Sequence, residues 1–192
     1  MKNLVEVKNL KKSYDLKEAV RGISFKIKDN EILGLLGPNG SGKTTAIGMM
    51  LGLLKPSNGE IIIDGKKIED NRIEILKKIN FISPYIELPK KLTVKQNLIV
   101  YGKLYSVPDI KKRIEYLSEK LRLEDLLNRI TGELSSGQKN RVSLAKALIN
   151  NPKVLLLDEP TASLDPEIAD FVRTFLENYK KEKKISILLA SH

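Results

Sequence analysis

A glycine-rich octapeptide between residues 37 and 44 constrains the fold of this chain more than any other segment. It reads Gly-Pro-Asn-Gly-Ser-Gly-Lys-Thr and matches the pattern G-x-x-x-x-G-K-[ST], whose backbone N–H groups converge on phosphate oxygens. Residues 33–36 before it read as a strand, and residues 43–54 read as a helix. A strand, a glycine loop and a helix in this order predict a phosphate-binding unit within an α/β core.

A second segment, more than a hundred residues further on, ends in two carboxylates. Residues 154–157 form a short apolar run of the kind seen in buried parallel strands, and Asp158 and Glu159 follow it directly. Ligands bind at the carboxyl ends of such strands. We therefore expect Asp158 and the Thr44 hydroxyl to hold Mg²⁺, Lys43 to lie between the β- and γ-phosphates, and Glu159 to orient and deprotonate the attacking water.

The composition narrows the class of protein. The 192 residues suffice for one α/β core, or for one domain with an inserted subdomain, and the absence of cysteine excludes disulfides and thiolate metal sites. No apolar run approaches the roughly 18–20 residues that span a bilayer, and no signal peptide is visible, so a membrane role requires a partner. The net charge is +10, but the basic clusters are interleaved with glutamate and aromatic content is 5%, so no nucleic-acid partner is expected.

The order of the predicted elements indicates a mostly parallel sheet flanked by helices. Strands are expected at residues 4–7, 19–28, 31–36, 60–63, 80–82, 154–157 and 185–190. Helices are expected at residues 43–54, 93–105, 108–123, 124–128 and 166–180, with another beginning near Ser136. Because the helices between residues 85 and 150 interrupt the alternation of strands and helices, they read as an inserted helical block.

The pentapeptide Leu134-Ser135-Ser136-Gly137-Gln138 resembles the signature sequence LSGGQ of the ATP-binding cassette (ABC) ATPases. The order of the glycine loop, this signature, the strand with two carboxylates, Ser163-Leu164-Asp165 and Ser191-His192 is also similar to that family. The resemblance implies an α/β fold with a P-loop NTPase core, an N-terminal antiparallel β part and an inserted helical subdomain. It implies an ATP-binding core at residues 1–84 and 151–192, and a helical subdomain at residues 85–150 that ends in the signature helix.

The resemblance also implies roles for individual residues. The adenine of ATP would stack on Tyr14, and His192 would act as a catalytic residue that contacts the γ-phosphate. The signature would contact ATP bound to a second subunit, and Ser163 and Asp165 would couple the two sites of the dimer. The residues expected to bind ATP are Tyr14, Gly37, Pro38, Asn39, Gly40, Ser41, Gly42, Lys43, Thr44 and Thr45.

Three positions depart from the family pattern. Pro84 stands where the family carries a glutamine that binds Mg²⁺ and water, and a proline side chain cannot donate a hydrogen bond. Ser136 replaces a glycine of the signature, which is a small change. Family domains continue beyond the position of His192, so the sequence is expected to be truncated at its C-terminus.

Three functions are compatible with these observations. The first is the ATP-hydrolysing subunit of an ABC transporter, in a homodimer or with a paired ABC ATPase, cytoplasmic and attached to the inner face of the membrane through a permease subunit. The second is a soluble ABC ATPase that acts on ribosomes or nucleic acid, which the net charge favours slightly. The third is a nucleotide-dependent module that hydrolyses ATP weakly or not at all, which Pro84 favours.

Overall fold

Two four-stranded sheets form the framework of the molecule. The computed structural model describes residues 3–15, 17–84, 87–162 and 164–191. The first sheet is parallel, and its strands in spatial order are β3 (Ile32–Leu36), β8 (Ser186–Ser191), β7 (Val154–Asp158) and β6 (Ile79–Ile82). The second is antiparallel, in the order β2 (Lys17–Lys28), β1 (Asn3–Tyr14), β4 (Asn58–Ile63) and β5 (Lys66–Lys67).

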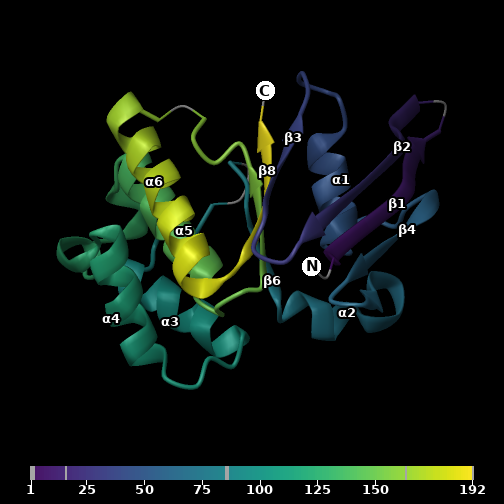
Figure 1. The fold of residues 1–192 in the computed structure, drawn as a ribbon. Coiled ribbons are helices and arrows are strands. Elements are labelled where there is room, and N and C mark those ends of the chain that lie inside the picture. The colour runs from purple at the N-terminus through teal and green to yellow at the C-terminus, as the bar shows by residue number, and fades with distance from the viewer. Residues whose placement is uncertain (1–2, 16, 85–86, 163, 192) are drawn as a thin grey trace.

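Helices cover the parallel sheet on one side, and the antiparallel sheet with two further helices covers the other (Figure 1). On the first side are α3 (Val94–Leu104), α4 (Ile110–Leu121), α5 (Ser136–Leu148) and α6 (Pro166–Lys183). On the second side are α1 (Lys43–Met50) and α2 (Ile68–Leu76). Short 3₁₀ turns at Glu124–Leu126 and Thr131–Glu133 connect α4 to α5. Among the described helices, none combines the length and the apolar character that a membrane span requires.

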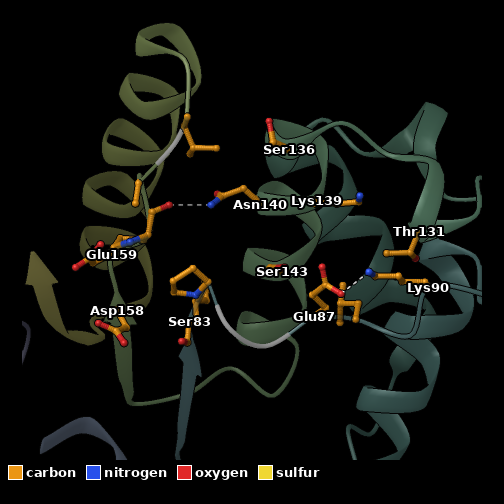
Figure 2. A pocket seen from close by; sticks show the side chains of 16 residues that line it. Ser83, Glu87, Lys90, Thr131, Ser136, Lys139, Asn140, Ser143, Asp158 and Glu159 are labelled. Carbon is orange, nitrogen blue, oxygen red and sulfur yellow. Dashed lines mark hydrogen bonds and ion pairs between the residues drawn. The ribbon is translucent and has the colours of Figure 1, made fainter. Parts of the chain in front are cut away.

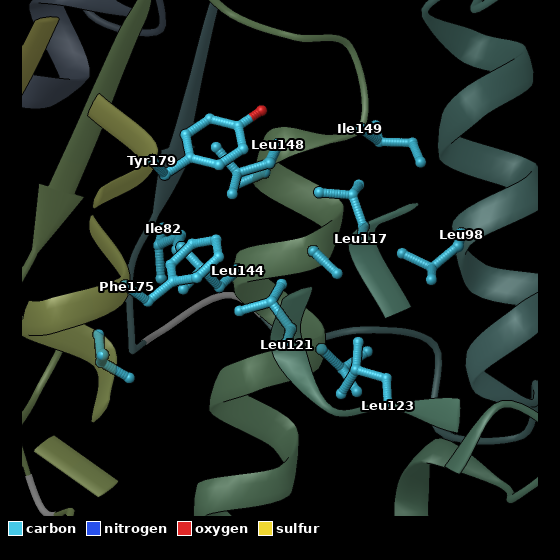
Figure 3. Packing of buried hydrophobic residues seen from close by; sticks show 14 of the residues in the cluster. Ile82, Leu98, Leu117, Leu121, Leu123, Leu144, Leu148, Ile149, Phe175 and Tyr179 are labelled. Atoms are coloured by element: carbon cyan, nitrogen blue, oxygen red, sulfur yellow. The ribbon is translucent and has the colours of Figure 1, made fainter. Parts of the chain in front are cut away.

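The central strand β7 is apolar up to Asp158 because both of its faces are buried. Along β7, Leu155 and Leu157 pack into one hydrophobic core, while Val154 and Leu156 pack into the other. This follows from the two-residue period of a strand, and it explains why the run Val154–Asp158 lacks a polar face. Figure 3 shows the first core, in which Leu117 and Leu144 of the helices meet Phe175 of α6.

Local sequence signals set where several helices begin. Ser135 caps α5: its side chain accepts a hydrogen bond from the N–H of Gln138, whose side chain accepts one from the N–H of Ser135. Thr93 and Gln96 form the same capping box at the start of α3. Pro166 occupies the first turn of α6, where a missing N–H costs nothing. These caps fix the register of the helices that pack on the sheet.

The predicted α/β class with a parallel sheet and an antiparallel part is confirmed, but some element boundaries were wrong. The first strand extends to Tyr14 because it pairs with both β2 and β4, and the first helix ends at Met50, shortly before Gly52, which has a positive φ of 63°. The helix expected at residues 124–128 is a single 3₁₀ turn, and α2 was not expected. The division into a core and a helical subdomain remains a proposal, since one hydrophobic core includes residues of both parts.

Candidate nucleotide site

The phosphate loop follows β3 directly and depends on glycine for its shape. Gly40 and Gly42 have φ values of 79° and 94°, in the left-handed region that glycine adopts without strain. A Cβ atom at Gly42 would also lie 2.3 Å from the carbonyl oxygen of Ala19 on β2. The Gly37 N–H donates to the carbonyl of Ser191, 3.3 Å away, so the loop is fastened to β8. The backbone here therefore tolerates no side chain at position 42.

The loop ends at the N-terminus of α1, where the partial positive charge of the helix dipole lies beside the ammonium group of Lys43. Gly42 is the N-cap residue and has no side chain that could cap α1. The first backbone N–H groups of α1 therefore receive no hydrogen bond from an N-cap side chain. Lys43 is only 7% exposed, and its Nζ donates to the carbonyls of Gly37 and Pro38. A buried ammonium group beside a helix N-terminus suits a polyanion.

A hydroxyl and a carboxylate meet beside this loop. The Thr44 hydroxyl donates to Asp158 Oδ2 at 2.8 Å, although the two residues are 114 positions apart in the chain. Asp158 is 2% exposed, and burying a carboxylate is costly without a compensating partner. Both groups offer oxygen atoms, the ligands that Mg²⁺ prefers, and Mg²⁺ commonly takes one or two protein ligands together with phosphates and water. The pair therefore fits the expected magnesium site.

Glu159 stands at the turn that follows β7, in an unfavourable backbone conformation. Its φ is 50°, in the left-handed region that costs a residue with a side chain about 1–2 kcal/mol. Its N–H donates to the carbonyl of Ala190 at 3.0 Å, and its own carbonyl accepts from Ala162 at 3.1 Å. The neighbouring strand and the turn thus hold the residue in place beside the phosphate loop.

These residues surround one pocket with a volume of about 340 Å³, which we call the phosphate pocket. Most of the predicted ATP-binding residues line it, except Gly37 and Pro38, whose carbonyls face Lys43. Tyr14 is 45% exposed and lines the pocket, and the Nζ atom of Lys12 lies over its ring, 5.0 Å from the centroid. The lining residues are Tyr14, Lys17, Ala19, Asn39, Gly40, Ser41, Gly42, Lys43, Thr44, Thr45, Pro84, Asp158 and Glu159.

The signature pentapeptide lies outside this pocket. Leu134 is buried, Ser135 and Gln138 form the capping box of α5, and a Cβ atom at Gly137 would lie 3.3 Å from Ile168 of α6. Ser136 lines a second pocket, of about 240 Å³, between α5 and the turn after β7 (Figure 2). The structure therefore gives most of the signature a helix-capping or packing role within its own chain.

Of three further predicted residues, the structure describes Asp165 but not Ser163 or His192. Asp165 is the exposed N-cap residue of α6 and makes no side-chain capping bond there. Ser163 and His192 lie outside the described residues. Ser191, which precedes His192, pairs with Leu36 at the entrance to the phosphate loop.

Some residues at the site escaped the sequence analysis. Lys17 and Ala19 line the phosphate pocket from β2, and Asn140 of α5 donates a hydrogen bond to Pro160, beside Glu159. No local pattern marks them, because each comes from an element distant in the chain. Pro84 was identified as a departure from the family, and it lines both pockets together with Asp158 and Glu159.

Comparison with known proteins identifies the family. The family model described as "ABC transporter" matches residues 20–162. The ABC transporter ATP-binding protein NatA of Bacillus subtilis is 39% identical over 178 residues, which cover 91% of this chain and 72% of NatA. The bacitracin transport ATP-binding protein BcrA of Bacillus licheniformis is 35% identical over 195 residues, which cover 100% of this chain and 62% of BcrA. The chain thus spans about two thirds of the length of these relatives.

Solved structures give the same assignment. CbiO1 of Clostridium perfringens, part of the ABC transporter complex cbiONQ, has a TM-score of 0.86 and 33% identity over 100% of this chain and 79% of its own. A dimeric ATP-binding cassette, MJ0796, in a post-hydrolysis state bound to ADP and Pi has a TM-score of 0.87 and 30% identity over 98% of this chain and 88% of its own. With its glycine loop, paired carboxylates and signature set on this fold, the chain belongs to the ABC transporter family of ATPases.

Proposed function

We propose that this chain is the ATP-binding and ATP-hydrolysing subunit of an ABC transporter, which forms a head-to-tail dimer around two Mg-ATP molecules and drives separate membrane subunits. The observation that carries the proposal is the convergence of the phosphate loop, the Thr44–Asp158 pair and Glu159 on one pocket. Each of these groups suits one part of a nucleoside triphosphate undergoing hydrolysis.

Different residues of the pocket bind the nucleotide and take part in its hydrolysis. The backbone N–H groups of the loop and the α1 N-terminus bind the phosphates, and Lys43 turns from the loop carbonyls toward the β- and γ-phosphates. Tyr14 stacks on the adenine ring. Glu159 accepts the proton of the attacking water as it approaches the γ-phosphorus.

Magnesium fits the oxygen donors of this site. Thr44 and Asp158 would hold it, and when bound it supplies positive charge that offsets the charge of the phosphates. The Thr44 hydroxyl, which donates to Asp158, is free to rotate and to present its lone pairs instead.

The position of the signature supports a dimer. Ser136 is exposed on the wall of the second pocket, and the signature residues are absent from the lining of the phosphate pocket within the described chain. A second subunit placed head to tail would bring its own signature against the γ-phosphate, and Ser163, Asp165 and His192 would couple and complete the two sites. Loss of the γ-phosphate would then weaken the contact between subunits and let the dimer open.

The proposed partner and place in the cell follow from the relatives. NatA and BcrA are named as the ATP-binding proteins of transport systems, and CbiO1 as part of a transporter complex. We extend this to a permease partner here, with the subunit on the cytoplasmic side of the membrane. No nucleic-acid partner is proposed.

The direct test is Mg-ATP hydrolysis measured as a function of protein concentration, with Lys43→Ala as the control for the binding site. We expect turnover per subunit to rise with concentration, because each site needs two subunits, and to disappear in the Lys43→Ala protein together with ATP binding. Turnover that is independent of concentration would contradict the dimer, and its absence from a wild type that binds ATP would contradict the hydrolytic function.

Pro84 favours a second candidate, a nucleotide-dependent module without hydrolysis. It lines the pocket beside Asp158 and Glu159, at the position where the family carries a glutamine, and its side chain offers no polar atom. A Pro84→Gln protein separates the two candidates. If ATP turnover appears only in this variant, the wild-type chain is a nucleotide-dependent module.

A further inference from the structure

One hydrogen bond crosses the second pocket, from the signature helix to the turn that carries Glu159. The Asn140 Nδ2 atom donates to the carbonyl oxygen of Pro160 at 2.8 Å, and Figure 2 shows the bond between the two walls of the pocket. Asn140 lies on α5, in the turn after Ser136, and Pro160 is buried. Two elements separated by 20 positions in the chain are therefore joined beside the reacting groups.

The turn needs such support because its backbone is strained. Glu159 combines a φ of 50° with a position before proline, where the pyrrolidine ring further restricts the backbone. A strained residue keeps its conformation only when its surroundings fix it from several sides. The Ala190 carbonyl fixes the Glu159 N–H, the Ala162 N–H fixes its carbonyl, and Asn140 fixes the next carbonyl in the chain.

Of these three hydrogen bonds, the one from Asn140 comes from the α5 helix. Ala190 belongs to β8, and Ala162 belongs to the turn itself, whereas Asn140 moves with α5. Proline has no N–H of its own, so the Pro160 carbonyl is the backbone group of that residue able to form a hydrogen bond. A shift of α5 by a fraction of a hydrogen-bond length would pull on the peptide next to Glu159.

We propose that Asn140 is a positioning residue that sets the backbone of the Glu159–Pro160 turn from the signature helix, so that the orientation of the general base depends on where α5 lies. The effect on catalysis rests on the proposed ATPase function, whereas the hydrogen bond itself does not. It adds a link within one subunit between the signature helix and the residue proposed to activate water.

Kinetics of ATP hydrolysis test the catalytic consequence. In Asn140→Ala we expect kcat to fall about tenfold, the effect of losing one hydrogen bond to a buried carbonyl, with KM for ATP unchanged. Asn140→Gln keeps the amide donor and should recover most of the loss. A fall in kcat matched by a rise in KM, or failure of glutamine to restore activity, would overturn the positioning role.

Asn150→Ala is the matched control. Its side chain donates to the carbonyl of Lys77 and accepts from Asn80, so it also ties the end of α5 to the parallel sheet, but far from Glu159. If Asn140 acts only by holding the helix against the sheet, Asn150→Ala should reduce kcat by a similar factor, which would overturn the proposal. We expect Asn150→Ala to lower the melting temperature and leave kcat within about twofold.

Hydrogen exchange separates this proposal from the proposed function, because it needs no ATP hydrolysis. The amides of Glu159, Ala162 and Leu164 are hydrogen-bonded within or beside the turn, and we expect them to exchange about tenfold faster in Asn140→Ala than in Asn150→Ala. If the wild type shows no turnover but this difference is found, the link stands and the ATPase function fails. Equal exchange in the two variants overturns the link.

Discussion

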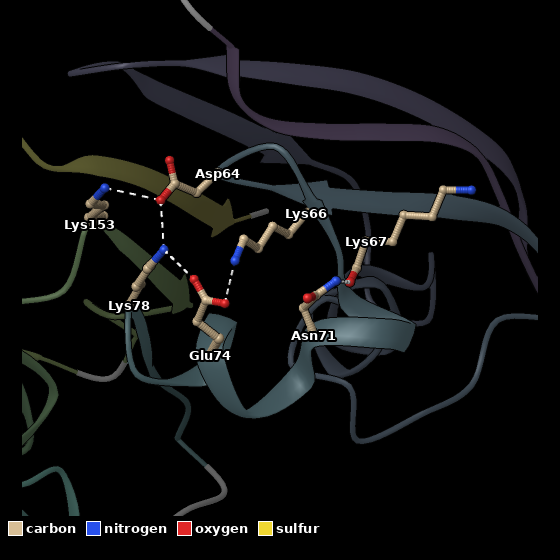
Figure 4. Close-up of polar contacts among 7 residues, drawn as sticks. All are labelled: Asp64, Lys66, Lys67, Asn71, Glu74, Lys78 and Lys153. Carbon is tan, nitrogen blue, oxygen red and sulfur yellow. Dashed lines mark hydrogen bonds and ion pairs between the residues drawn. The ribbon is translucent and has the colours of Figure 1, made fainter.

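The two ends of the parallel sheet are held together in different ways. At the amino end, the Asp64 carboxylate accepts hydrogen bonds from Lys78 at 2.9 Å and Lys153 at 3.0 Å, and Glu74 joins Lys78 to Lys66 (Figure 4). At the carboxyl end, single hydrogen bonds join two pairs of residues that are distant in the chain, Thr44 with Asp158 and Asn140 with Pro160.

The difference shows how the fold separates stability from chemistry. The charges at the amino end satisfy one another, so this end has little left to offer a ligand. At the carboxyl end, Lys43 donates to the backbone carbonyls of Gly37 and Pro38, and the Thr44 hydroxyl can rotate. Under the proposed function, both groups would exchange these partners for phosphate and metal. The ion pairs around Asp64 thus stabilise the end of the sheet opposite the site.

The largest expected effect of breaking the carboxyl end is on catalysis. Glu159→Gln removes the proposed proton acceptor while keeping the size of the side chain, so we expect kcat for ATP hydrolysis to fall about a thousandfold, with ATP still bound. Phosphate release and nucleotide binding measure the two effects. Asp64→Asn, the same change at the amino end, serves as the control and should leave kcat within about twofold; a comparable loss there would erase the contrast between the ends.

Lys146, which lies between the two ends, tests how a buried charge affects stability. It is 8% exposed on α5, its Nζ donates to the Phe81 carbonyl at 3.2 Å, and burial lowers its pKa from 10.5 to about 8. The folded state therefore binds its proton less tightly than the unfolded state, which destabilises the fold at pH 7 by up to about 3 kcal/mol. We expect Lys146→Met to raise the free energy of unfolding at pH 7.

The pH dependence provides the check on that expectation. Wild-type stability should rise as the pH increases from about 8 toward 10.5, because the unfolded state keeps the proton over this range, while Lys146→Met lacks this rise. Urea unfolding of both proteins at pH 7 and at about pH 9.5 measures the difference. A constant difference between the two proteins would show that the charge is stabilised inside the fold.

A smaller effect is expected from the amino-end network. Hydrogen bonds from Lys78 and Lys153 lower the pKa of Asp64 from 3.8 to about 2, and its side chain is 16% exposed. The depressed pKa contributes stability that is fully present above about pH 4 and is lost as the pH falls toward 2. Asp64→Asn should therefore cost about 2 kcal/mol at pH 7, and less at pH 3. Chemical denaturation at both pH values tests this, and a cost that does not change with pH would contradict it.

The smallest effect on stability compares two equivalent caps. Ser135 and Thr93 each form a capping box, at the starts of α5 and α3, and replacing either by alanine should lower the free energy of unfolding by about 1 kcal/mol. If Ser135 also contacts ATP of a partner subunit, Ser135→Ala should reduce ATPase activity far more than Thr93→Ala. Equal activity in the two variants would reduce the role of Ser135 to helix capping.

The sequence predicted the glycine loop and the buried strand before Asp158 because local rules define the backbone of both. Gly40 and Gly42 occupy positive φ values that other residues avoid, and the buried strand before Asp158 needs apolar residues on both faces. Each of these requirements restricts the residue types within a short segment, so a few consecutive residues are enough to identify it. The parallel sheet followed from the same alternation of strands and helices.

The parts that escaped prediction depend on partners distant in the chain. The length of β1 comes from pairing with β2 and β4, and α2 has few buried apolar residues, Ile68 and Ile75, and an interruption of helical geometry at Asn71. Asn140 looks like any polar residue of a helix, and only the fold brings Pro160 to it. Tertiary contacts, which local periodicity does not encode, determined these features.

The left-handed backbone at Glu159 has a consequence for how this sequence can change. A glycine there would relieve about 1 kcal/mol of strain, and so would be favoured by any selection for a more stable chain. Under the proposed role of Glu159 as the general base, selection for ATP hydrolysis would oppose that substitution. If that role is correct, a chain no longer selected for hydrolysis should accept glycine at position 159 with a gain in stability and a loss of turnover.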